Sequence, residues 1–98
     1  MQVAILGCGV VGRGTADLLT ANAEAIAARA GEPVTVKYIL ERREIPDCPY
    51  QALFVKDFET IVSDPEVSVV IEAMGGSHPA YDFSLRALEA GKHVITSN

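Results

Sequence analysis

The chain alternates between short apolar segments and longer segments with apolar residues on one face only. The short segments are rich in Val, Ile and Leu and predict strands. Their ranges are Gln2–Leu6, Val34–Leu40, Ala52–Val55, Val67–Glu72 and Lys92–Thr96. Apolar residues at helical spacing between them, with charged residues opposite, predict helices. The helices are expected over Val11–Ala30, Phe58–Val62 and Pro79–Ala90.

The order of these elements predicts an α/β fold of the Rossmann type, with helices on both faces of a parallel sheet. A right-handed crossover places the second strand beside the first, and we expect five strands in the order 3-2-1-4-5. The 98 residues are enough for one domain, residues 1–98. Because the sequence stops directly after the fifth strand, we expect a truncated fragment of a longer protein.

A glycine-rich turn joins the first strand to the first helix: Gly7-Cys8-Gly9-Val10-Val11-Gly12. Two glycines in such a turn leave backbone N–H groups exposed at the helix N-terminus, where the helix dipole favours a pyrophosphate. The third, Gly12, lets the helix lie close to the sheet. We therefore take Gly7, Gly9, Val10, Val11 and Gly12 as candidate cofactor-binding residues. The alternative is a tight turn that binds nothing, since G-x-G-x-x-G alone is a weak motif.

The loop after the second strand begins with Glu41-Arg42-Arg43, where a Rossmann domain contacts the adenosine ribose. An acidic side chain there favours NAD, whereas arginine pairs with the additional phosphate of NADP. The two arginines lead us to expect NADP in preference to NAD, with Arg42 and Arg43 as binding residues. A solvated charged loop is the alternative.

The loops after the fourth and fifth strands reach the same edge of the sheet. Met74, Gly75 and Gly76 allow backbone to approach the nicotinamide ribose, and Thr96 and Asn98 border the same region. A plain turn capped by Ser77 explains the glycines almost as well, and His78 is expected to be a turn residue.

Glu72, at the end of the fourth strand, could orient a loop or substrate, or could equally cap nearby N–H groups.

The net charge of −5 argues against nucleic acid as a partner. No apolar run approaches the roughly 20 residues that cross a bilayer, so we expect a soluble, cytoplasmic protein. Cys8 and Cys48 have no metal-site spacing and are expected to be free thiols, with Cys8 filling a buried niche. No metal is expected.

Three blocks together resemble the N-terminal NAD(P)-binding domain of homoserine dehydrogenase. They are Ile5 to Gly12, Val70 to Gly76 with its Glu-x-x-Gly-Gly, and Ala90 to Asn98 with Ala-Gly-Lys-His-Val-x-Thr-x-Asn. The resemblance implies an oxidoreductase of threonine and methionine biosynthesis that interconverts L-homoserine and L-aspartate 4-semialdehyde by hydride transfer. It also implies a homo-oligomer whose catalytic, substrate-binding and dimerising residues lie beyond Asn98. We therefore expect this chain to bind cofactor without catalysing, and name no catalytic residue in it.

Two alternatives stay open. Aspartate dehydrogenase and the glucose-fructose oxidoreductase type also carry Ala-Gly-Lys-His-Val, but the latter continues into Glu-Lys-Pro where this chain has Thr96-Ser97-Asn98. A domain that senses a dinucleotide without catalysis is the non-enzyme alternative.

Overall fold

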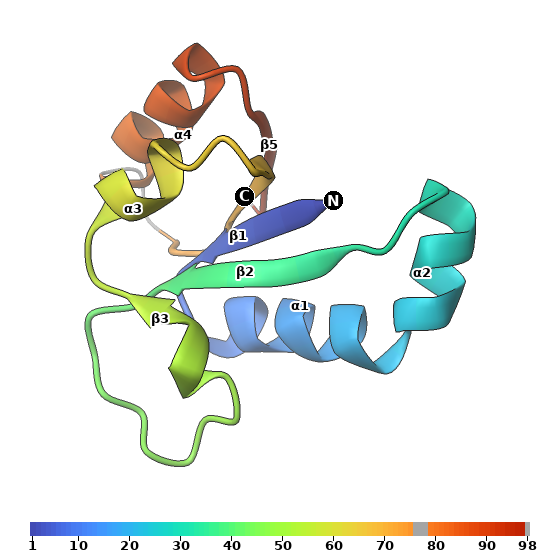
Figure 1. The fold of residues 1–98 in the computed structure, drawn as a ribbon. Helices are drawn as coiled ribbons and strands as arrows, with labels where there is room; N and C mark the ends of the chain where they lie inside the picture. The colour runs from blue at the N-terminus through green and yellow to red at the C-terminus, as the bar shows by residue number, and fades with distance from the viewer. Residues whose placement is uncertain (76–78, 98) are drawn as a thin grey trace.

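The structure, a computed structural model, describes residues 1–75 and 79–97. One five-stranded parallel sheet runs in the order β3-β2-β1-β4-β5, which confirms the predicted fold class and strand order (Figure 1). The strands are β1 (Gln2–Leu6), β2 (Thr35–Leu40), β3 (Phe54–Val55), β4 (Val67–Glu72) and β5 (His93–Thr96). The helices are α1 (Val10–Ala21), α2 (Ala23–Ala30), α3 (Phe58–Val62) and α4 (Ala80–Glu89), with the 3₁₀ turn η1 (Gln51–Leu53).

The sheet carries an apolar core on each face because successive side chains of a strand point to opposite sides. On one face Ala4 and Leu6 of β1 pack with Ile61 of α3 and Ala87 of α4. On the other face Ile5 packs with residues of α1 and the loop after β2. Figure 1 shows α1 on one side of the strands and α3 and α4 on the other. Two helical layers therefore cover the sheet, as a doubly wound fold requires.

The single helix predicted over 11–30 is wrong, because Asn22 divides it into α1 and α2. The backbone N–H and the side-chain Nδ2 of Asn22 both donate to the carbonyl of Leu18, at 3.0 Å each. An asparagine side chain that bonds to a nearby backbone carbonyl competes with the regular helix. Gly31 then ends α2 in the left-handed conformation, with φ of 82°.

The third strand is shorter than predicted. Gln51 to Leu53 form the 3₁₀ turn, in which the Leu53 N–H donates to the carbonyl of Tyr50 at 2.8 Å. Only Phe54 and Val55 pair with β2. Asp57 caps the next helix, α3, since its side chain accepts from the Glu59 N–H at 3.0 Å.

The apolar residues in the middle of β4 are buried to different extents. Val70 is fully buried, but Val69 and Ile71 are only half-buried. On the face of Ile71 the covering helix α1 packs mainly against β1 and β2. Among the residues that the structure describes, the helices are too short or too polar to span a bilayer.

The carboxyl ends of four strands lie side by side and bring their loops together. Leu6 is in register with Leu40 of β2 and Glu72 of β4, and Glu72 is in register with Thr96 of β5. Backbone hydrogen bonds extend this alignment one residue beyond the strands: Gly7 N–H to Leu40 O at 2.9 Å, Ala73 N–H to Leu6 O at 3.0 Å and Ser97 N–H to Glu72 O at 3.1 Å. The loops that carry the candidate residues therefore begin from one rigid edge.

Candidate functional site

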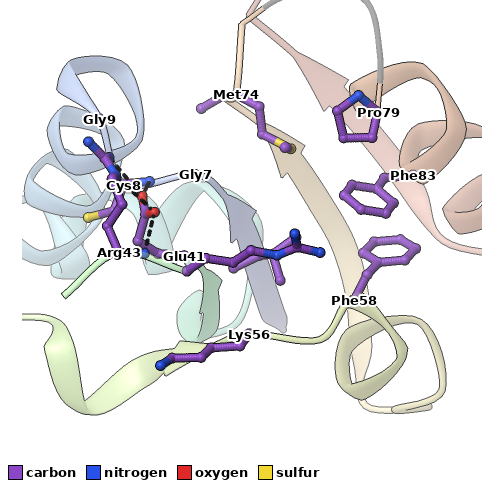
Figure 2. Close-up of a pocket in the computed structure, with 13 residues that line it drawn as sticks. Gly7, Cys8, Gly9, Glu41, Arg43, Lys56, Phe58, Met74, Pro79 and Phe83 are labelled. Carbon is purple, nitrogen blue, oxygen red and sulfur yellow. Dashed lines mark hydrogen bonds and ion pairs between the residues drawn. The ribbon is translucent and has the colours of Figure 1, made fainter.

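A cavity of about 470 Å³ lies at this edge, between the glycine turn, the loop after β2 and the loop after β4 (Figure 2). Its wall combines backbone, charged and aromatic groups. The lining residues are Gly7, Cys8, Gly9, Leu40, Glu41, Arg42, Arg43, Lys56, Phe58, Ala73, Met74, Pro79 and Phe83. The cavity thus stands beyond the carboxyl ends of the strands where the strand order reverses, which is where open α/β sheets bind ligands.

The glycine turn is packed so closely that two of its glycines have no room for a side chain. A Cβ at Gly12 would lie 1.9 Å from the carbonyl oxygen of Gly7, closer than any real contact. Gly7 itself has φ of 98°, and a Cβ there would lie 3.1 Å from the carbonyl oxygen of Ala73. These two glycines are therefore required by the fold, because they allow α1 and the loop after β4 to close on the turn.

Gly9 differs from its two neighbours because nothing lies within 4 Å of the position its Cβ would take. It is the N-cap residue of α1 and lines the cavity. The first N–H groups of a helix have no partner within the helix. The space beside Gly9 is therefore open next to backbone donors and the positive end of the α1 dipole. Val10 and Val11 begin that helix and are exposed.

Glu41 is buried beside the cavity and accepts four hydrogen bonds. Oε1 accepts from the Cys8 N–H at 3.0 Å and from Arg43 Nη2 at 2.9 Å. Oε2 accepts from the Arg43 N–H and from Arg43 Nε, both at 3.1 Å. A carboxylate has about four lone-pair sites, so this one is saturated. The Cys8 bond also ties the glycine turn to the loop after β2.

This network lowers the pKa of Glu41 from 4.5 to about 2, chiefly through the side-chain hydrogen bonds from Arg43. Burial acts in the opposite direction, and the backbone N–H groups of Arg43 and Cys8 lower the pKa further. The carboxylate is consequently ionised at neutral pH, and its charge is balanced by one arginine.

Arg42 and Lys56 supply the remaining positive charge of the cavity. Both line it and both are exposed, and Arg42 forms no ion pair or hydrogen bond within residues 1–75 and 79–97. With Arg43, three cations and one carboxylate, that of Glu41, line the cavity. Sequence patterns indicated the two arginines but missed Lys56, which lies one residue beyond the short strand β3.

Phe58, Phe83 and Pro79 form an apolar wall of the cavity that the sequence did not indicate. The rings of Phe58 and Phe83 stack with centroids 4.4 Å apart. Phe58 begins α3 and Phe83 lies in α4, so only the fold brings them together. Figure 2 shows this wall on the side of the cavity opposite the glycine turn.

The nicotinamide-side candidates are only partly placed. Met74 lines the cavity, and Gly75 has φ of 73°, a conformation that favours glycine. Thr96 ends β5, and its hydroxyl donates to Glu72 Oε1 at 2.8 Å. Gly76 and Asn98 lie outside the described residues. So do Ser77 and His78.

Both cysteines are free and Cys8 is buried, as predicted. Cys48 is buried as well, with its Sγ atom 3.8 Å from that of Cys8. Burial is the main cause that raises the pKa of Cys8 to about 11. Cys8 is therefore a protonated packing residue beneath the turn at neutral pH. In the part of the chain that the structure describes, no three His, Cys, Asp or Glu side chains are grouped to hold a metal ion.

A sequence model of the family described as "Homoserine dehydrogenase, NAD binding domain" matches residues 7–98. The homoserine dehydrogenase of Pseudomonas aeruginosa is 42% identical over the whole of this chain, which covers 23% of that protein. The crystal structure of Staphylococcus aureus homoserine dehydrogenase at pH 7.0 superposes with a TM-score of 0.89 and 32% identity, over all of this chain and 26% of that one. The Thiobacillus denitrificans enzyme gives a TM-score of 0.86 and 36% identity, over 100% and 23% of the two chains. This chain therefore spans about a quarter of the length of the relatives it matches.

The contact between Gly12 and the Gly7 carbonyl predicts a large loss of stability in Gly12→Ala. The new Cβ has to displace backbone, which we expect to cost about 3 kcal/mol or more. Gly14→Ala is the matched control, since Gly14 lies in the same helix with nothing within 4 Å of its Cβ position. That variant should gain about 0.5–1 kcal/mol from helix propensity. Urea denaturation followed by circular dichroism measures both, and equal stability of the two variants would contradict the close approach.

The lowered pKa of Glu41 predicts a stability that depends on pH. Its folded-state pKa of about 2 lies below the ordinary value of 4.5, so the stabilisation is present above pH 4.5 and is lost as the pH falls towards 2. We expect Glu41→Gln to lose about 2 kcal/mol at pH 7, a figure reduced for the solvent exposure of Arg43. The difference from the unmodified chain should shrink towards zero near pH 2. Glu44→Gln, at an exposed carboxylate of the same loop, is the control, and a pH-independent deficit in Glu41→Gln would contradict the assignment.

Proposed function

This chain belongs to the family of homoserine dehydrogenase NAD-binding domains, and we propose that its cavity binds NADP in preference to NAD. The observation that carries the proposal is the open space at Gly9, beside the start of α1 and inside a cavity lined by cations. A dinucleotide requires a site of this kind for its pyrophosphate. In this proposal Gly7, Gly9, Val10, Val11 and Gly12 form the pyrophosphate site, with Gly7 and Gly12 shaping the turn.

The preference for NADP rests on the saturation of Glu41. To bind the ribose hydroxyls of NAD, this carboxylate would have to exchange hydrogen bonds that it already receives from Arg43 and Cys8. The 2′-phosphate of NADP instead needs cations. Arg42 and Lys56 supply these cations. Arg43 neutralises the Glu41 carboxylate, which would otherwise repel the phosphate, and the exposed side of the Arg43 guanidinium can also contact the ligand.

The nicotinamide end is proposed to lie towards the loops after β4 and β5. Met74 lines the cavity on that side, and we propose that Gly75, Gly76, Thr96 and Asn98 border the nicotinamide ring and its ribose. The bound nicotinamide supplies the hydride chemistry, and the protein holds it in place.

For the whole protein we propose the activity that its relatives' name states, dehydrogenation of homoserine. From the family resemblance we add the product, L-aspartate 4-semialdehyde, the reverse reaction and a homo-oligomeric state. Residues 1–98 are the cofactor-binding domain in this proposal. The substrate-binding and catalytic groups then belong to sequence outside it, and the chain alone binds cofactor without turnover. The alternative to an enzyme is a domain that senses the dinucleotide.

Calorimetric titration of the chain with NADP and NAD tests the proposed preference. We expect NADP to bind more tightly, and Arg42→Ala to weaken NADP binding about tenfold through loss of one charge-assisted contact. NAD affinity should change less than about twofold, because NAD lacks the 2′-phosphate. Arg29→Ala, at an exposed arginine in α2, is the control. Tighter binding of NAD than of NADP would contradict the proposed preference. If the chain bound neither dinucleotide, the proposed function would be wrong. We expect no reduction of the cofactor when homoserine is added to the chain.

Gly9→Val tests the pyrophosphate site without disturbing the fold. The backbone of Gly9 has φ of −82° and space around its Cβ position, so a valine is accommodated. Its methyl groups would occupy the space assigned to the pyrophosphate, and we expect affinity for either dinucleotide to fall at least about a hundredfold, or about 2.7 kcal/mol. Thermal denaturation should show a folded variant. If folded Gly9→Val bound both dinucleotides with unchanged affinity, the glycine turn would not be the pyrophosphate site.

A further inference from the structure

We propose that Glu72 is a positioning residue whose carboxylate fixes the nicotinamide side of the cleft, an inference that rests on the proposed function. Glu72 ends β4 and is among the most deeply buried side chains, at 1% exposure. It does not line the cavity, so its action is through the groups that it holds.

The carboxylate joins two loops that are far apart in sequence. Oε2 accepts from the Met74 N–H at 2.7 Å, and Oε1 accepts from the Thr96 hydroxyl at 2.8 Å. Its own backbone carbonyl accepts from the Ser97 N–H at 3.1 Å. One residue thus fixes both the first turn of the loop after β4 and the end of β5.

A structural role in the core alone does not explain a carboxylate at this position. Val70, two residues earlier on the same strand face, is apolar and fully buried, as expected beneath α3 and α4. Burial of a carboxylate carries a desolvation penalty that is offset only by hydrogen bonds with good geometry. Its bonds from the Met74 N–H and the Thr96 hydroxyl connect the loop after β4 to the end of β5, so its placement favours a defined conformation of that loop.

The position of the Met74 backbone matters because it packs directly against the glycine turn on one side. A Cβ on Gly7 would lie 3.1 Å from Ala73 O and 3.3 Å from Met74 Cα, so the loop after β4 lies directly against the glycine turn. Met74 also lines the cavity. Release of its N–H from Glu72 would let the loop move where the nicotinamide half is proposed to bind.

The strand order places Glu72 and the residues proposed to bind the adenosine half of the cofactor on opposite sides of β1. Glu41, Arg42 and Arg43 follow β2, on one side of β1, whereas Glu72 and Thr96 belong to β4 and β5 on the other side. Loss of the Glu72 carboxylate is therefore expected to weaken contacts to the nicotinamide end and to leave contacts to the adenosine end intact.

The test compares NADP with adenosine 2′,5′-bisphosphate, which keeps the adenosine end and the 2′-phosphate but lacks the nicotinamide and its ribose, by calorimetry on the chain. Glu72→Ala should weaken NADP binding about tenfold, as expected for loss of one buried hydrogen-bond network, with the affinity for adenosine 2′,5′-bisphosphate changed less than about twofold. Glu72→Gln should restore NADP affinity, because its amide can accept from the Met74 N–H and donate to the Thr96 hydroxyl. Val67→Ala, a buried truncation at the other end of β4, controls for general destabilisation and should not change the ratio of the two affinities.

A second variant keeps the inference testable if Glu72→Ala does not fold. Thr96→Val removes the hydroxyl that donates to Glu72 Oε1 at the end of β5, and it should weaken NADP binding more than binding of the comparison ligand. Equal weakening of both ligands, no weakening, or equal affinity of the unmodified chain for both ligands would overturn the role of Glu72. Failure of the unmodified chain to bind either ligand would instead overturn the proposed function on which this inference rests.

Discussion

The contact between α1 and the turn that precedes it is the constraint on which the rest of the cleft depends. Gly12 brings the helix so close to the Gly7 carbonyl that not even a methyl group fits between them. That approach places the first N–H groups of α1 at the carboxyl end of β1, next to the loops from β2 and β4. Gly7 then allows the loop after β4 to close over the turn from the other side.

Two buried glutamates extend this arrangement symmetrically around the central strand. Glu41 directly follows β2 and Glu72 ends β4, and these strands flank β1. Each carboxylate accepts a backbone N–H from a cleft loop, Cys8 for Glu41 and Met74 for Glu72. A carboxylate buried in this way stabilises only one arrangement of its donors, since an unpaired buried charge is costly. The loops around the cleft are therefore organised before any ligand binds.

The sequence was sufficient for the strand order and the glycine turn, because apolar runs and glycine spacing are local signals. It was insufficient where contacts between distant segments decide the outcome. Phe58 and Phe83 form a wall only because α3 and α4 pack together. Similarly, the sequence Glu41-Arg42-Arg43 does not indicate which of the two arginines binds the glutamate, and in the structure it is Arg43. The helix break at Asn22 depends on a local residue, but the sequence pattern did not predict it. Ala21 and Ala23 on either side are good helix formers, so the helical spacing continues through Asn22.

The charge of the cleft shows why the net charge of a chain decides less than its distribution. The protein carries a formal charge of −5, yet the described wall of its cavity has three cations and one carboxylate. Apart from Glu41, no acidic residue of the described ranges lines the cavity, and two of the others, Asp64 and Glu66, pair with Lys37. An anionic ligand is thus repelled by the protein as a whole and attracted by one concave region, where field lines concentrate. Such a distribution discriminates against extended polyanions, which would meet the acidic surface as well, while a small anion that fits inside the cavity meets mainly the cations.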